Sequence, residues 1–240
     1  MVSKSQIKLI TSLGQKKYRE RQGLFVVEGI KGITEFLKSH FQLYALFTVE
    51  GYFDEVEADK KNIIEEGELK KISFLKTPQK AVAIFHIASA SSRNIKGLKV
   101  ALDDIRDPGN LGTIIRLCDW FGIDQLVCST QTVDCYNPKV IQATMGSLTR
   151  VQILYTDLSK YLEDKHIPVY GAFMEGENVY KTELEREGIL VMGNEANGIS
   201  SVVERFVTKR IAIPQFGGNK TESLNVATAA AILMSEFKRG

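Results

Sequence analysis

The hydrophobic positions along the chain follow one pattern before residue 97 and another after it. In the front part, runs rich in β-branched and aromatic residues flank a stretch with helical periodicity. The strand-like runs are GLFVVEG at 23–29, QLYALFTV at 42–49 and AVAIFHIA at 81–88, and the helical stretch is IKGITEFLKSH at 30–40. This arrangement predicts a small α/β unit.

From residue 98 onward, short and continuous apolar runs alternate with helical segments, which is typical of parallel strands covered on both faces. The six runs are LKVALDD (98–104), QLVCST (125–130), RVQILY (150–155), PVYGAFM (168–174), GILVMGN (188–194) and RIAIP (210–214). The small, polar stretch SASSRNIKG at 89–97 lacks periodicity and is typical of a linker. We therefore predict two domains, residues 1–92 and 93–240, the second an α/β domain with a parallel sheet.

The first of these runs is followed by ALDDIRDPGNLGTIIR, which combines turn residues with a helical pattern. Ligands of parallel sheets bind at the carboxyl ends of strands, so this junction is a candidate site. We expect Pro108 and Gly109 to form a tight turn and Asn110 to be the N-cap of the helix. The positive end of that helix favours an anion, and Arg116 within the helix would add a guanidinium group.

The fifth and sixth runs also end in polar junctions. Gly193 ends the fifth run and would let a ligand approach the backbone, and Glu195 follows it. The sixth run leads through a glycine-rich loop to Ser223 and Asn225, which precede the small apolar helix VATAAAILM. Ordinary helix capping explains these two polar residues as well as chemistry does.

Composition limits the class of protein without identifying it. The 240 residues are 44% hydrophobic, enough for sizeable cores. No run of eighteen apolar residues occurs, and the first residues lack the apolar region of a signal peptide, so we expect a cytoplasmic protein. Three cysteines without C-x-x-C spacing and three isolated histidines predict no metal site.

Charge is distributed unevenly along the chain. Residues 1–97 hold sixteen Lys or Arg against eleven Asp or Glu, whereas residues 98–240 hold fifteen against eighteen. A basic front part favours nucleic acid as a partner. The densest basic cluster is KKYRERQ, where Lys16, Lys17, Arg19 and Arg21 are either phosphate contacts or the solvated face of a helix.

Taken together, the three junctions resemble the motifs of a known family. DPGNLGTIIR, VMGNEANG and IPQFGGNKTESLNVA are similar, in order and spacing, to the three motifs of the SpoU (TrmH-like) branch of SPOUT RNA methyltransferases. GLFVVEG, after a basic segment, is similar to the small ribosomal-protein-like RNA-binding domain that precedes the catalytic domain in many members.

This resemblance implies transfer of a methyl group from S-adenosylmethionine to a ribose 2′-hydroxyl of RNA, ribosomal RNA being favoured. It also implies a deep trefoil knot in the second domain and a homodimer formed through that domain. The residues implied at the reacting centre are Asn110, Arg116, Glu195, Ser223 and Asn225, and those whose backbone would hold the cofactor are Gly193, Ile213 and Leu224.

Several alternatives stay open at this point. Arg116 is expected to bind the phosphate beside the target ribose, but a guanidinium is not normally deprotonated in proteins. Proton removal is therefore open between Arg116, Glu195 and water. Transfer RNA is an alternative substrate, and a non-catalytic RNA-binding protein is an alternative class. A dinucleotide-binding oxidoreductase is disfavoured, because no G-x-G-x-x-G follows the first strand of the second domain.

Overall fold

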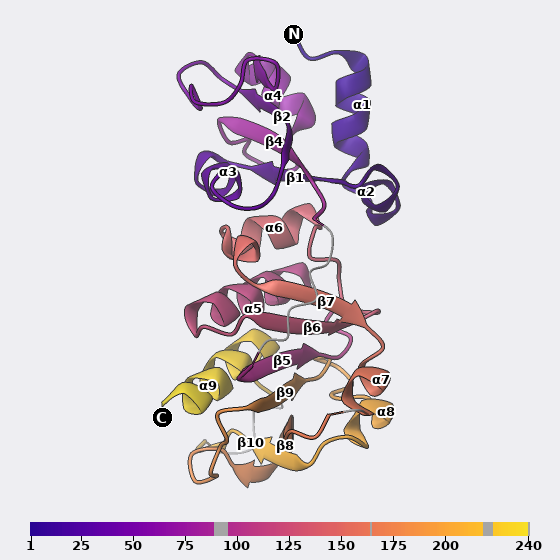
Figure 1. Ribbon diagram of the computed structural model, residues 1–240, viewed down its shortest axis with the longest axis vertical. Coiled ribbons are helices and arrows are strands. Elements are labelled where there is room, and N and C mark those ends of the chain that lie inside the picture. The colour runs from indigo at the N-terminus through magenta and orange to yellow at the C-terminus, as the bar shows by residue number, and fades with distance from the viewer. Residues whose placement is uncertain (89–95, 164, 218–222, 240) are drawn as a thin grey trace. The chain divides into compact units, whose positions relative to one another are not determined.

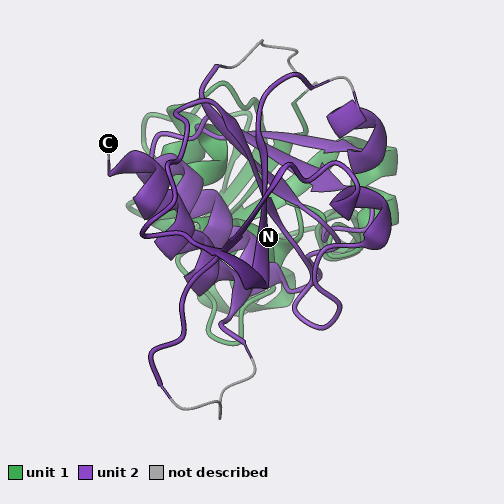
Figure 2. Ribbon diagram, turned by 90° about the horizontal axis from the view of Figure 1, so that it is seen from below, with its two compact units in different colours: residues 1–89, 134–149 green, residues 90–133, 150–240 purple. Residues whose placement is uncertain are grey.

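The computed structural model describes residues 1–88, 96–163, 165–217 and 223–239, which divide into two compact units (Figure 1, Figure 2). Unit 1 comprises Met1–Ser89 and Asp134–Thr149, and unit 2 comprises Ala90–Val133 and Arg150–Gly240. The boundary predicted after residue 92 lies outside the described residues. The segment 134–149, which the sequence assigned to the second domain, packs instead within unit 1.

Two contacts explain why the segment 134–149 packs within unit 1. The buried guanidinium of Arg19 donates hydrogen bonds to the carboxylate of Asp134, at 2.9 Å from Nε and 2.5 Å from Nη2. The ring of Tyr136 packs on that of Phe25, with centroids 4.7 Å apart. Both partners are far away in the sequence, so the apolar pattern of the segment alone could not indicate which unit it joins.

Unit 1 contains a four-stranded sheet with the order β1-β4-β2-β3. Strand β4 is antiparallel to both β1 and β2, and β3 is parallel to β2. Its elements are α1 (Lys4–Ser12), α2 (Lys16–Gln22), β1 (Leu24–Glu28), α3 (Ile30–Leu37), β2 (Leu43–Thr48), β3 (Lys61–Ile63), α4 (Glu66–Ile72), β4 (Ala81–His86), α6 (Pro138–Thr144) and the 3₁₀ helix η1 (Ser147–Thr149). The predicted small α/β unit is confirmed.

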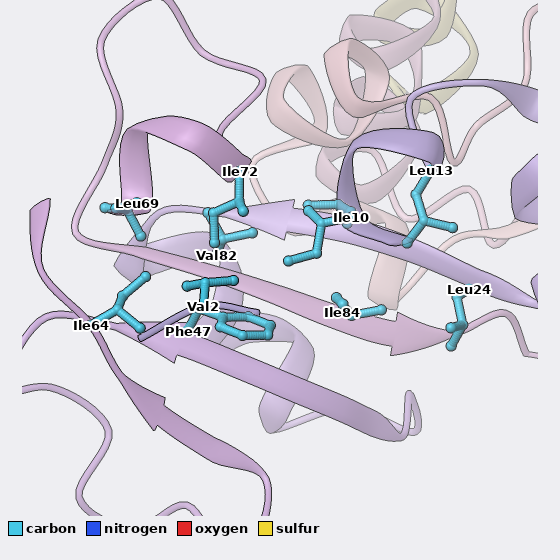
Figure 3. Packing of buried hydrophobic residues seen from close by; sticks show 11 residues of the cluster. Val2, Ile10, Leu13, Leu24, Phe47, Ile64, Leu69, Ile72, Val82 and Ile84 are labelled. Atoms are coloured by element: carbon cyan, nitrogen blue, oxygen red, sulfur yellow. The ribbon is translucent and has the colours of Figure 1, made fainter. Parts of the chain in front are cut away.

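Strands β1 and β4 are buried on both faces of this sheet, which explains their continuous apolar runs. On one face, Ile10 of α1, Leu13 directly after it, and Leu69 and Ile72 of α4 cover a cluster that includes Val82 (Figure 3). On the other face the core is aromatic, formed by rings that lie 4.7 to 6.5 Å apart between centroids. These rings belong to Phe25, Phe36, Phe41, Phe85 and Tyr136.

Unit 2 contains a six-stranded sheet with the order β10-β8-β9-β5-β6-β7, and all of its strand pairs are parallel. The predicted α/β domain with a parallel sheet is therefore confirmed. Its elements are β5 (Leu98–Leu102), α5 (Pro108–Trp120), β6 (Gln125–Ser129), β7 (Gln152–Thr156), α7 (Leu158–Glu163), β8 (Val169–Asn178), β9 (Gly188–Met192), α8 (Ser201–Glu204), β10 (Lys209–Ala212) and α9 (Val226–Lys238).

Helices cover both faces of the parallel sheet (Figure 1). Helices α5 and α9 pack against each other on one face. On the other face, Leu158 and Leu162 of α7 and Val203 of α8 join a buried cluster with strand residues such as Val127 and Val191. This arrangement brings the carboxyl ends of neighbouring strands β5 and β9 to one edge, from which α5 and the loop before α8 begin.

Strand β8 departs from regular pairing beside β10. Arg210 pairs with Gly171 and the next residue, Ile211, pairs with Glu177, so residues 172–176 arch out of the ladder. The deep trefoil knot implied by the resemblance stays a prediction.

Candidate active site

The loop after β9 requires glycine at its first position. A Cβ atom placed on Gly193 would lie 2.2 Å from the carbonyl carbon of Gly198 and 2.3 Å from the nitrogen of Ile199. The sequence predicted this glycine as a point of close approach, with a ligand as the expected neighbour. The observed neighbour is the backbone of the same loop, which closes through two hydrogen bonds between Asn194 and Gly198 of 2.8 and 3.0 Å.

The N-cap of α5 is Asp107 and not Asn110, which corrects the sequence-based assignment. The carboxylate of Asp107 accepts a hydrogen bond of 2.8 Å from the backbone N–H of Asn110, and Pro108 occupies the first helical turn. Asp and Asn are equally good caps, so the sequence alone does not decide between them. With Asp107 as the cap, the side chain of Asn110 is free for other contacts.

Asn110 connects residues from all three sequence motifs. Its Nδ2 donates to Oε1 of Glu195 at 2.6 Å, and its Oδ1 accepts from Nδ2 of Asn225 at 2.9 Å. Asn225 is itself the N-cap of α9, where its Oδ1 accepts from the backbone N–H groups of Ala227 and Thr228 at 2.9 and 3.2 Å. We call the chain Asn225–Asn110–Glu195 the amide relay.

The direction of the amide relay follows from its end at α9. A backbone N–H can only donate, so the oxygen of the Asn225 amide must face α9 and its nitrogen must face Asn110. Asn110 then presents its oxygen to Asn225 and its nitrogen to Glu195. Glu195 can meet an N–H donor only with an unprotonated oxygen, so the relay holds Glu195 as a hydrogen-bond acceptor.

The other oxygen of Glu195, Oε2, has no hydrogen-bond partner among the described residues, and the residue is exposed. The carboxylate therefore keeps lone pairs available for a hydroxyl, a water molecule or a cationic group of a ligand.

A pocket of about 910 Å³ opens beside Glu195 in unit 2. This volume is within the range of about 300–1,000 Å³ typical of small-molecule sites. All three residues expected to hold the cofactor line it, as do two of those expected at the reacting centre. They are Gly193, Ile213, Leu224, Glu195 and Ser223.

The lining of the pocket fits S-adenosylmethionine, which combines a flat apolar base with positive charge. Apolar side chains such as Met192, Leu224 and Leu233 provide surface for the base, and the carboxylates of Glu175 and Glu195 provide negative charge. Glu175 belongs to the arch of β8, which the sequence analysis did not assign to the site. The only available signal was the pair Gly171 and Gly176 within an otherwise regular strand pattern.

Arg116 lies on α5, six residues beyond Asn110, or about 9 Å along the helix axis. It is exposed, and among the described residues none forms a hydrogen bond or ion pair with its side chain. The structure therefore leaves the guanidinium accessible to a ligand outside the pocket, but it does not connect Arg116 to the amide relay.

The basic cluster of α2 is divided between the surface and the interior of unit 1. Lys16, Lys17 and Arg21 are exposed, and Lys16 lies 3.8 Å from Glu20. Arg19 is only 2% exposed and also donates to the carbonyl of Leu13 at 2.8 Å. The expectation that Arg19 contacts RNA is therefore wrong, because its guanidinium is already used inside the fold.

Metal-ligand clusters and membrane-spanning helices are both absent from the described residues. Within residues 1–88, 96–163, 165–217 and 223–239, no three His, Cys, Asp or Glu side chains gather as metal ligands would. Within the same ranges, every helix is too short or too polar to cross a membrane.

Family models match both halves of the chain. Residues 97–235 match the SpoU rRNA Methylase family, and residues 4–83 match the MRM3-like substrate binding domain. The first match covers more than half of the chain and contains every residue of the amide relay.

Individual relatives align along nearly the whole chain. A 23S rRNA (guanosine(2553)-2′-O)-methyltransferase, RlmP of Bacillus subtilis, is 27% identical, over 94% of this chain and 93% of its own length. A structure described as a putative RNA methyltransferase of the TrmH family from Porphyromonas gingivalis is 38% identical, with a TM-score of 0.91, and covers 100% of this chain and 99% of that one.

A third comparison bears on the cofactor. The AdoMet-bound rRNA methyltransferase of Sinorhizobium meliloti is 28% identical, with a TM-score of 0.89, and covers 100% of this chain and 97% of that one. The sequence motifs, the parallel sheet and these relatives agree. The chain therefore belongs to the SpoU rRNA Methylase family.

Proposed function

We propose that this protein is an S-adenosylmethionine-dependent methyltransferase that modifies a ribose 2′-hydroxyl in ribosomal RNA. The observation that carries the proposal is the amide relay, which joins all three motifs and holds the Glu195 carboxylate at the edge of a pocket of about 910 Å³. The choice of ribosomal RNA is supported by relatives named as rRNA methyltransferases that match both units of this chain.

Within this proposal, the bound cofactor supplies an electrophilic methyl group on its sulfonium centre. The chain must then place a ribose oxygen in line with that methyl group and receive the hydroxyl proton. Arg116, exposed on α5, binds the adjoining phosphate and orients the ribose. Oε2 of Glu195 is an acceptor for the hydroxyl proton, directly or through a water molecule, since a guanidinium is a poor base.

The exposed basic residues of α2 are proposed to bind RNA phosphates remote from the reacting ribose. Lys16, Lys17 and Arg21 remain candidates, without Arg19. The match of residues 4–83 to a substrate binding domain supports this role.

We also propose that the protein works in the cytoplasm as a homodimer formed through unit 2. Support for the dimer comes from Trp120, which is 84% exposed at the end of α5, the helix that packs on α9. Obligate interfaces commonly bury more than about 2,000 Å². Light scattering at micromolar concentration should give twice the chain mass, and a monomer would contradict this part of the proposal.

The decisive experiment supplies the purified protein with methyl-labelled S-adenosylmethionine and RNA from cells that lack it. We expect label in ribosomal RNA at one nucleotide, resistant to alkaline cleavage on its 3′ side because the 2′-hydroxyl is blocked. Label confined to transfer RNA would show that transfer RNA, and not ribosomal RNA, is the substrate. RNA binding without any label, with cofactor bound, would favour a non-catalytic protein.

A further inference from the structure

The loop 193–200, which carries Glu195, is tied at both ends to the residues that follow β5. Near its start, Nδ2 of Asn194 donates to the backbone carbonyl of Asp104 at 2.6 Å. At its end, the backbone N–H of Ser200 donates to Oδ2 of Asp103 at 2.8 Å. Glu195 lies between these two ties, and the segment that follows β5 leads directly into α5 and Asn110.

The amide of Asn194 has only one possible orientation. Its Oδ1 accepts from the backbone N–H groups of Ala196 and Asn197, at 2.9 and 3.3 Å. Since those groups can only donate, Nδ2 must face Asp104. One side chain therefore does two things: it shapes the turn that contains Glu195, and it connects that turn to the start of the α5 junction.

The carbonyl that Asn194 reaches belongs to a residue with unfavourable backbone geometry. Asp104 has φ of 58°, a left-handed conformation that costs free energy for residues other than glycine. Three contacts hold it there: its N–H donates to Oγ of Ser129 at 2.9 Å, and its carboxylate accepts two hydrogen bonds of 2.9 Å from Arg106. Such conformations persist where the surroundings over-determine them, typically at functional sites.

The far end of the loop is held from the protein interior. Asp103 is 6% exposed, and its own N–H donates to the carbonyl of Met192 at 2.9 Å. Its carboxylate therefore keeps a fixed position at the end of β5. With Ser200 held there, the 2.6 Å bond from Asn194 determines where the intervening turn places Glu195.

We infer that Asn194 is a positioning residue for methyl transfer, which sets the distance between Glu195 and Asn110 by tying its loop to Asp104. The inference rests on the proposed function, because it assigns Asn194 a role in that reaction. Asn194 lines the pocket, but its Nδ2 and Oδ1 are both engaged within the chain, so in this scheme it touches neither the ribose nor the transferred methyl group. It acts through Glu195, whose bond to Asn110 is 2.6 Å long.

Two substitutions remove the hydrogen bond from Asn194 to Asp104 and keep the bonds that support the turn at Ala196 and Asn197. In Asn194→Asp, one oxygen still accepts from Ala196 and Asn197, but the other replaces Nδ2 and repels the Asp104 carbonyl. In Asn194→Ser, the hydroxyl still supports the turn and is too short to reach Asp104. Asn197→Asp is the matched control, since Asn197 is exposed in the same loop and no described residue bonds to its side chain.

For both Asn194 variants we expect single-turnover methyl transfer to fall about 10- to 100-fold, with the cofactor Kd within about twofold and little change in Tm. Lowering the pH should restore part of the activity of Asn194→Asp relative to the wild type, because a protonated carboxyl regains a donor for Asp104. Asn194→Ser should show no such recovery. Asn197→Asp should transfer methyl groups within about twofold of the wild-type rate.

A second readout does not require turnover. In the cofactor-free protein, the side-chain amide NMR signals of Asn110 and Asn225 report the relay, and both should shift in the two Asn194 variants but not in Asn197→Asp. Unchanged amide signals, or wild-type rates in both variants, would overturn the inference. Equal losses of rate, cofactor affinity and Tm would also overturn it, since they indicate a general structural role. If the amide signals shift in both Asn194 variants as expected, but the wild-type protein methylates no RNA, the proposed function alone would be refuted.

Discussion

Replacing Asn225 by Asp tests the direction of the amide relay with a change of one atom. Asp caps helices as well as Asn does, so its oxygen can still accept from Ala227 and Thr228 at the start of α9. The second oxygen, however, replaces the Nδ2 that donates to Asn110 at 2.9 Å. Two acceptors then face each other.

The conflict cannot be removed by turning the Asn110 amide around. A flipped Asn110 would donate to the new carboxylate, but its oxygen would then face Oε1 of Glu195, where the present distance is 2.6 Å. Only an added proton restores an alternating order of donors and acceptors. The Asn225→Asp variant must therefore either lose one hydrogen bond of the relay or bind a proton that the wild type does not.

The expected magnitudes differ for stability and for catalysis. Because Asn225 and Glu195 are exposed, water replaces part of the lost bond, and the free energy of unfolding should change by less than about 1 kcal/mol. Misplacement of Glu195 should lower the single-turnover rate about 10- to 100-fold, equivalent to about 1.4–2.8 kcal/mol of activation free energy. The ratio of variant to wild-type rate should rise as the pH falls, since protonation relieves the conflict.

The assay is single-turnover methylation of the mapped RNA between pH 5.5 and 8, with thermal unfolding and cofactor titration on the same preparations. Asn137→Asp is the matched control, because Asn137 caps α6 through a 2.9 Å bond from the N–H of Lys139 and takes no part in the relay. A variant at Asn225 with wild-type rates at every pH would refute the relay. A variant whose rate ratio is low but independent of pH would refute its assigned direction.

Four further predictions concern other parts of the chain. Arg116→Ala should lower the rate of methyl transfer at least about 100-fold, while the cofactor Kd measured by calorimetry stays unchanged. Loss of cofactor binding would contradict the proposal that Arg116 binds the RNA. Arg21→Ala should reduce the slope of log K against log salt concentration for RNA binding by about 0.7 to 0.9. Arg19→Ala should instead lower the free energy of unfolding, measured by chemical denaturation, by about 3–5 kcal/mol, because it leaves Asp134 without its ion-pair partner. Similar behaviour of the two variants would refute the distinction between them. Gly193→Ala should cost about 1–3 kcal/mol and weaken cofactor binding, since its Cβ would meet Gly198 at 2.2 Å, and wild-type stability would contradict that contact. Burial raises the pKa of Glu28, so its contribution to the free energy of unfolding is full below the unfolded pKa of about 4.3 and is lost as the pH rises through the folded pKa. The stability of the wild type relative to Glu28→Gln should therefore rise on acidification, and a difference that does not change with pH would contradict this.

Much of the catalytic unit could be predicted from local sequence. Continuous apolar runs identify strands that are buried on both faces, and polar residues directly after a run mark a carboxyl edge of the sheet. For this reason the three junctions that contain Asn110, Glu195 and Asn225 could be singled out, and their resemblance to the family's motifs made these residues candidates. Helix capping was less determinate, because Asp107 and Asn110 are both good caps and only the folded backbone selects Asp107.

Contacts between residues far apart in the sequence were decided by the tertiary structure alone. Arg19 belongs to a basic cluster typical of an RNA-binding surface. Its side chain is nevertheless buried in unit 1, where it forms an ion pair with Asp134, 115 positions later in the sequence. The segment 134–149 joins unit 1 for the same reason. The sequence by itself determined which residues follow the strands and which charges each part carries. The direction of the amide relay required the fold, because it depends on which donors and acceptors the folded chain brings within hydrogen-bonding distance.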